Sequence, residues 1–147
     1  MTQELNQFEQ STEKGVLDKN RNYNLFDAKV ASGSGNTLTG GTAVVIQDEA
    51  GKVLTIDKAA AITDDIFGIV LYESRKNSFV ADDFVRIAFN NSVVNMEASA
   101  AIAKGAALEV VLTGDKVATQ STGTTIGRAL DKASADGDII RVLITTN

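Results

Sequence analysis

Short apolar runs separated by turn-forming residues dominate the chain from Gly40 onward. They recur at spacings of roughly 8–12 residues, which is typical of all-β sandwiches and barrels. The intervening segments carry the Gly, Asn or Asp that tight turns need, as at Asn90-Asn91. Because the chain contains no proline, no run is excluded from a strand on that ground. The predicted strands are Ala43–Gln47, Lys52–Ile56, Ile66–Glu73, Phe84–Phe89, Val93–Met96, Leu108–Leu112, Lys116–Thr119, Ile126–Leu130 and Ile139–Thr145.

Two further stretches favour short helices, Asp57–Thr63 and Glu97–Lys104. The second is rich in alanine, the best helix former, and is followed by Gly105, a residue type that often follows the last turn of a helix. The sequence therefore predicts an all-β fold, a small β-sandwich or barrel, with one or two short helices.

The segments of this region also resemble one another in order, which indicates an internal repeat. The offset between matched segments shrinks along the chain, as short deletions would produce. The matches are Gly41–Ile46 with Gly105–Val110, Lys52-Val53 with Lys116-Val117, Ile66–Leu71 with Thr125–Leu130, and Asp83–Ala88 with Asp138–Leu143. Two similar β-units, packed face to face or closed into one barrel, would account for this pattern. Chance similarity among strands rich in Val, Ile and Gly is the alternative.

The first 39 residues differ from the rest of the chain. Residues 1–29 are rich in Gln, Asn, Glu and Lys and show no sustained helical or strand periodicity. Residues 31–37 have the Gly- and Ser-rich composition of a flexible linker. We therefore expect an extended N-terminal arm and linker over residues 1–39, followed by a β-domain over residues 40–147. The alternative is an irregular first layer that packs on its own domain.

Three aromatic residues lie in the predicted arm, Phe8, Tyr23 and Phe26, although only 5% of the chain is aromatic. A purely solvated tail would carry fewer of them. Their spacing suits an extended segment docked on a surface better than one face of an amphipathic helix. We therefore expect these three residues to dock on the surface of a partner or of a neighbouring subunit.

The chain contains no cysteine and no histidine. It therefore lacks thiolate nucleophiles, thiolate metal ligands and the most common general base. The segments Gly33-Ser34-Gly35 and Gly51-Lys52 do not complete a nucleotide-binding motif. The pairs Asp64-Asp65 and Asp82-Asp83 fit turns better than a calcium loop. The sequence predicts no catalytic, cofactor-binding or metal-binding residues, so we expect a protein that is not an enzyme.

The formal net charge of the chain is −5. Nucleic acid and anionic membranes carry the same sign of charge, so neither is expected as a partner. The chain has no apolar run long enough to cross a bilayer, and Met1–Gln10 lacks the basic start and apolar stretch of a signal peptide.

Arg86 and Arg141 occupy matching positions in the repeat, each between apolar neighbours. One interpretation places both on the outward faces of their strands. The other makes them ion-pair donors at a subunit interface, where arginine is favoured.

Several motifs of the β-region occur in an order that resembles the small capsid decoration, or cement, proteins of tailed bacteriophages. The resemblance covers about Gly40 to Thr146 and is strongest in the second half of the chain. The motifs that carry it are Gly41–Val45, Gly51–Thr55, Ile66–Leu71, Val85–Phe89, Met96–Leu108, Thr124–Leu130 and Gly137–Ile144.

This resemblance implies a structural virion protein that is made in the cytoplasm of a bacterial host and binds the outer surface of a phage capsid. Proteins of this kind often form homotrimers between capsomers and clamp neighbouring subunits of the major capsid protein. A carbohydrate- or receptor-binding β-module, such as the base of a head fibre, is the alternative. Tyr72 and Phe79 are then the candidate stacking residues, although both suit a core equally well. An unusual carboxylate enzyme would need two carboxylates that converge in one pocket.

Overall fold

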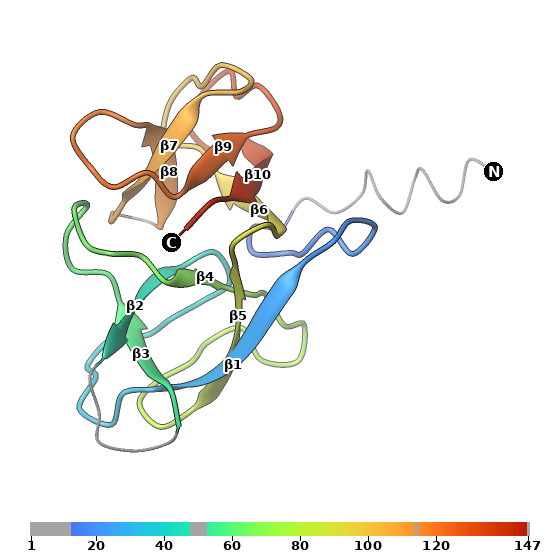
Figure 1. The fold of residues 1–147 in the computed structure, drawn as a ribbon. Coiled ribbons are helices and arrows are strands. Elements are labelled where there is room, and N and C mark those ends of the chain that lie inside the picture. The colour runs from blue at the N-terminus through green and yellow to red at the C-terminus, as the bar shows by residue number, and fades with distance from the viewer. Residues whose placement is uncertain (1–12, 48–52, 114, 147) are drawn as a thin grey trace.

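The computed structural model describes residues 13–47, 53–113 and 115–146, and within them it contains ten β-strands and no helix (Figure 1). The strands are β1 (Asn24–Val30), β2 (Ala43–Gln47), β3 (Thr55–Lys58), β4 (Gly68–Val70), β5 (Phe84–Phe89), β6 (Val93–Glu97), β7 (Ala107–Val111), β8 (Lys116–Thr119), β9 (Gly127–Ala129) and β10 (Ile139–Ile144). The predicted all-β fold class is therefore confirmed. Strands β1–β5 form one unit, the barrel unit, and β6–β10 form a second, the sheet unit, above it in Figure 1.

The barrel unit is closed, with the strand order β1-β3-β2-β4-β5. It closes where β5 pairs antiparallel with β1, from Asn24↔Phe89 to Lys29↔Phe84. Because side chains alternate between the two faces of a strand, one row of apolar residues from each strand fills the interior. This inner cluster comprises Ala28, Val30, Leu38, Val44, Ile56, Val70, Phe79, Val85 and Ile87, with Leu54 and Phe67 packed against it.

The sheet unit, with the order β6-β10-β9-β7-β8, repeats the connectivity of the barrel unit. In the barrel unit β4 pairs with β2 and β5, and in the sheet unit β9 pairs with β7 and β10. The antiparallel pairs Ala43↔Ile69 and Ile69↔Ala88 of the barrel unit correspond to Ala107↔Arg128 and Arg128↔Leu143 of the sheet unit. The parallel pair Val30↔Ile56 of the barrel unit corresponds to Ala98↔Val117 of the sheet unit. The predicted organisation in two similar β-units is therefore confirmed. One difference is that Ala98↔Val117 is an isolated bridge, whereas the barrel unit has a parallel ladder at that place.

Three of the four sequence matches fall on corresponding strands. The match of Lys52-Val53 with Lys116-Val117 is shifted. Thr55 lies opposite Gln47 in the first hairpin, and Lys116 lies opposite Val111 in the second, so Thr55 is the counterpart of Lys116. Lys52 itself lies outside the described residues.

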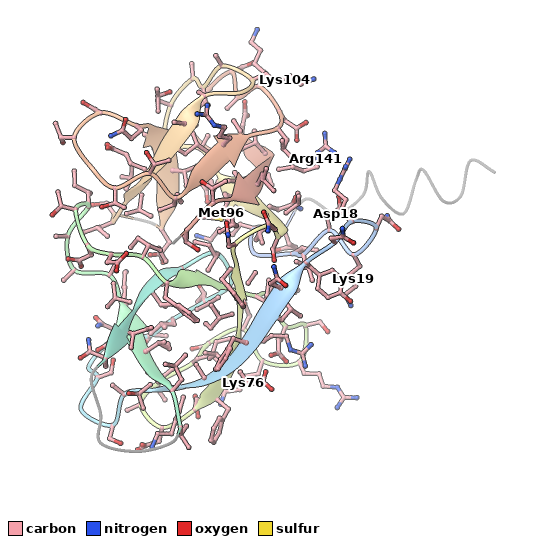
Figure 2. The ribbon with its side chains drawn as sticks, viewed as in Figure 1. Asp18, Lys19, Lys76, Met96, Lys104 and Arg141 are labelled. Carbon is pink, nitrogen blue, oxygen red and sulfur yellow. The ribbon has the colours of Figure 1, made fainter. Side chains whose placement is uncertain are left out.

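A second apolar core joins the two units. It combines the inward-facing side chains of the sheet unit with small and aliphatic side chains on the outer surface of the barrel. Met96, 1% exposed, lies at this junction (Figure 2). Three residues on adjacent barrel strands, Ala43, Ile69 and Ala88, are buried in this core, and we call them the covered face.

Neither predicted helix is present. Residues 57–58 end β3, and the turn that follows is held by Asp64, whose carboxylate accepts the backbone N–H groups of Ala60 and Ala61. In the second stretch, Ala98 bridges Val117, and its side chain is fully buried. Pairing with distant strands therefore overrides the helix propensity of alanine, which is only a weak preference.

The predicted arm also differs from the structure in its described part. Residues 24–30, within the expected arm, form β1 of the barrel. Leu38, within the expected linker region, is fully buried and bridges Phe79, and Leu17 bridges Val94 of the sheet unit. Apolar side chains at alternating positions gain more from burial in these cores than an extended arm would offer them. Phe8 lies outside the described residues, as do all of residues 1–12.

Candidate interaction surface

Two of the residues proposed as contacts are exposed on the barrel unit. The side chain of Tyr23, directly before β1, is 45% exposed, and that of Phe26 on β1 is 46% exposed. Phe26 faces the same way as the interior residues Ala28 and Val30, because it lies two and four positions before them on one strand. It is exposed because it lies at the end of the barrel rather than on its side.

Phe26 belongs to an aromatic cluster at this end of the barrel. Its ring and that of Phe67 meet edge to face, with 6.1 Å between the centroids and 83° between the planes. Phe67 in turn stacks on Phe89, with 5.6 Å between the centroids and 15° between the planes. Such edge-to-face and stacked contacts hold the rings in one arrangement.

Ile46 extends this apolar surface. It is 52% exposed, and together with Phe67 it lines an open depression of about 360 Å³. Asp64, Asp65 and Lys58 also line this depression. We call Phe26, Ile46, Phe67 and Phe89 the aromatic end of the barrel unit.

The sheet unit carries a different set of residues at the corresponding positions. According to the strand registers, the counterparts of Phe26, Ile46, Phe67 and Phe89 in the sheet unit are, in that order, Val94, Val110, Ile126 and Ile144. We call these four counterparts the aliphatic end. None of these four side chains is more than 3% exposed. They lie in the core that joins the units, together with the covered face of the barrel. The two ends are therefore equivalent in topology, but only the aliphatic end is covered.

Arg86 and Arg141 are in corresponding positions on β5 and β10 but have different partners. The Arg141 guanidinium donates to both carboxylate oxygens of Asp131, at 3.0 Å and 2.8 Å, and the Arg141 backbone N–H donates to the same carboxylate at 2.9 Å. These bonds hold the pKa of Asp131 below its ordinary value. Arg141 also faces the negative charge of Asp18, and Figure 2 shows the two residues on the same side of the molecule.

Arg86 forms a looser pair. Its Nε lies 3.9 Å from Oδ1 of Asp27, and both side chains are more than half exposed. The structure therefore places both arginines in ion pairs within the chain, and the proposal that they donate across a subunit interface remains a prediction.

The acidic pairs singled out in the sequence lie in turns. Asp83 accepts the backbone N–H of Val80, and this bond, followed by the hydrogen bond from the Lys76 ammonium, lowers the pKa of Asp83. Asp138, its counterpart, accepts the N–H groups of Ser134 and Ala135. Across residues 13–47, 53–113 and 115–146 we find no group of three carboxylates placed to hold a metal ion. Nor does that part of the chain contain a helix of the length and hydropathy that crossing a bilayer requires.

Phe26 was predicted from the sequence to be a contact residue, but the aromatic residues beside it were not. Phe67 and Phe89 were assigned to strands, where an aromatic side chain is ordinarily part of a core. The internal repeat could have identified these two residues. It aligns Phe67 with Ile126 and Phe89 with a position near the end of the last strand, so the aromatic residues stand where the second unit has aliphatic ones.

No family model and no curated protein sequence matches this chain. A solved structure does share its fold, that of the head fiber gp8.5 N base in bacteriophage phi29. The two superpose with a TM-score of 0.56 and 15% sequence identity, over 84% of this chain and 95% of the other. At this level of identity the comparison shows the common fold alone.

Proposed function

We propose that this protein is a structural component of a tailed-phage virion that binds the outer surface of the capsid. The observation that carries the proposal is the shared fold with a phage head fibre base, because the match spans most of both chains. The ordered motifs of residues 40–146 support the same assignment through their resemblance to capsid decoration proteins. On this proposal the protein is not an enzyme and needs no cofactor or metal.

The proposed mechanism is multivalent clamping. A homotrimer that contacts several subunits of the major capsid protein turns weak individual contacts into one strong attachment. Because the geometry for such contacts exists only on the assembled lattice, binding stabilises that lattice by mass action. Tyr23 is exposed in the free chain and is a candidate anchor, together with Phe8 from the segment outside the described residues.

The base of a head fibre is the second candidate function, and the fold comparison favours it specifically. Both functions place the protein on the outside of the head and require capsid binding. They differ in what the outward side carries, since a fibre base must hold a further appendage. Finding such an appendage attached to shell-bound protein would favour the fibre base over a decoration protein.

The experiment is cosedimentation of the purified protein with capsids that lack it. We expect the wild-type chain to sediment with the shells, and the variants Phe8→Ser and Tyr23→Ser to be retained less. Phe84→Ser is the matched control, because Phe84 is 65% exposed and is not among the candidate anchors. Failure of the wild-type chain to bind shells of its own phage would contradict the proposal.

A further inference from the structure

The aromatic end and the aliphatic end occupy the same place in two copies of one fold. The aliphatic end is buried in the same core as the covered face, Ala43, Ile69 and Ala88, which are at most 6% exposed. The aromatic end includes two side chains that are about half exposed, Phe26 and Ile46. A surface whose counterpart forms an interface, and which is itself apolar and uncovered, has the properties of an unoccupied interface.

The chain also carries a counterpart of the covered face. On the sheet unit, Ala107, Arg128 and Leu143 lie side by side across β7, β9 and β10, in the register that Ala43, Ile69 and Ala88 have in the barrel. We call these three residues the Arg128 face. Arg128 is exposed, whereas Ala107 and Leu143 are partly buried.

We propose that the aromatic end of one copy packs on the Arg128 face of another copy. The contact between chains would then repeat the contact that the two units already make within each chain. This is a heterologous, head-to-tail interface, which closes into a ring when the rotation between copies permits. In a ring of three copies, six units would follow one another through the same kind of contact. The inference deepens the proposed self-association but does not depend on capsid binding.

The chemistry of the two surfaces is complementary. Arginine stacks favourably on aromatic faces, and the aromatic end offers three phenylalanine rings. The depression beside these rings is lined by Asp64 and Asp65, which attract a guanidinium, and by Lys58, whose charge is paired with Asp115 at 3.2 Å. The Arg128 guanidinium donates a hydrogen bond to the carbonyl oxygen of Gly105, just before the neighbouring strand β7, at 3.1 Å. Within the chain, the position of Arg128 is taken by Ile69, which suits an aliphatic rather than an aromatic partner.

Light scattering on the full chain at its highest soluble concentration tests the proposal. We expect a mass greater than that of one chain for the wild type, and the mass of one chain for Phe26→Asp and for Arg128→Glu. Ile46→Asp provides a second variant of the aromatic end in case Phe26→Asp fails to fold, which melting curves will reveal. Phe84→Asp and Arg75→Glu are the matched controls, since both residues are exposed, belong to neither proposed surface and undergo the same changes of charge. A monomeric wild type, or variants that associate as the wild type does, would overturn the proposal.

Mixing the two defective variants gives the decisive result. Phe26→Asp retains an intact Arg128 face, and Arg128→Glu retains an intact aromatic end, so one sound junction can form between them. We expect the mixture to form dimers of one chain of each kind and nothing larger. A mixture that stays monomeric would refute the head-to-tail arrangement. Measuring retention of the same variants on decoration-free shells separates this result from the proposed function, because self-association and shell binding can each fail alone.

Discussion

The barrel unit and the sheet unit share one topology but have opposite side-chain chemistry. All six phenylalanines and both tyrosines lie at or before residue 89, so the sheet unit contains no aromatic residue at all. Every large apolar side chain that is strongly exposed also belongs to the first part of the chain, among the described residues. The order of the strands is nevertheless the same in both units. The comparison teaches that backbone register, rather than particular core residues, defines this fold, while the choice of side chains decides which surfaces are covered.

The closure of the two units differs for a related reason. In the barrel unit β1 pairs with β3 at two positions, whereas in the sheet unit the corresponding contact is the single bridge Ala98↔Val117. The edge of β6 instead receives the segment before β1, where Leu17 bridges Val94 and the Gly15 N–H donates to the Asn95 carbonyl oxygen. Residues before β1 therefore contribute to the second unit, and β1 itself contributes to the first.

The largest expected effect comes from deleting residues 1–34. This deletion removes β1, so β5 and β3 lose their partner, the barrel cannot close, and Ala28 and Val30 leave its core. Because the junction core needs the outer surface of the barrel, we expect the sheet unit to lose its cooperative melting transition as well. A chain that begins at residue 13 keeps every described strand and is the matched control. Circular dichroism melting is the measurement, and a cooperative transition in the deleted chain would show that the units fold independently.

The second prediction compares the two ends directly. Ile144→Ala removes a fully buried side chain from the aliphatic end and should cost about 3 kcal/mol of unfolding free energy. Phe26→Ala at the aromatic end should cost about 1 kcal/mol in the monomer, since nearly half of that side chain is already in water. Urea denaturation at low protein concentration measures both values. Equal losses would mean that the aromatic end is as well covered as the aliphatic end.

The third prediction concerns what the two units share. A Cβ added to Gly68 would lie 2.5 Å from the carbonyl oxygen of Ala88, and one added to Gly127 would collide with the carbonyl oxygen of Leu143. Gly68→Ala and Gly127→Ala should therefore each cost about 2 kcal/mol, because the neighbouring strand has to move. Gly33→Ala is the control, since no atom beyond Gly33 and its two chain neighbours lies within 4 Å of the added Cβ. A large loss at only one of the two glycines would show that the strand crossings are not equivalent.

Much of this fold could be predicted from the sequence. The strands from β2 onward follow from apolar runs and turn residues, and the repeat was visible because Gly68 and Gly127 stand at matching places between apolar neighbours. β1 was missed even though Phe26, Ala28 and Val30 alternate with Asp27 and Lys29, because a single alternating stretch within a polar segment is weak evidence for a strand.

The candidate surface was harder to predict than the fold. Whether Phe67 and Phe89 lie in a core or at an open end depends on which unit covers them, and that is decided by the packing of the two units. A strand pattern reports which face of a strand is apolar, but not whether its last residue is covered. Only the comparison between equivalent residues of the two units identifies the aromatic end.

The smallest expected effect separates the two arginine pairs. Asp131→Asn removes a carboxylate that accepts three hydrogen bonds from Arg141, and it should cost about 1 kcal/mol at neutral pH, since solvent partly screens a carboxylate that is 37% exposed. Asp27→Asn should cost only a few tenths of a kcal/mol, in line with other exposed pairs, because Asp27 and Arg86 are 81% and 56% exposed.

The two aspartates also allow a test by pH. The pKa of Asp131 is lowered in the folded chain, so its contribution to stability is complete above the unfolded pKa of about 4 and is lost as the pH falls through the lower, folded value. The wild type should therefore lose stability in acid partly through Asp131, and Asp131→Asn should show a shallower fall of melting temperature below about pH 4. Melting curves of wild type and variant across this range are the measurement. Parallel curves would mean that the Arg141 pair on β10 contributes no more to folding than its looser counterpart on β5, and the contrast between the two units would then be confined to their apolar ends.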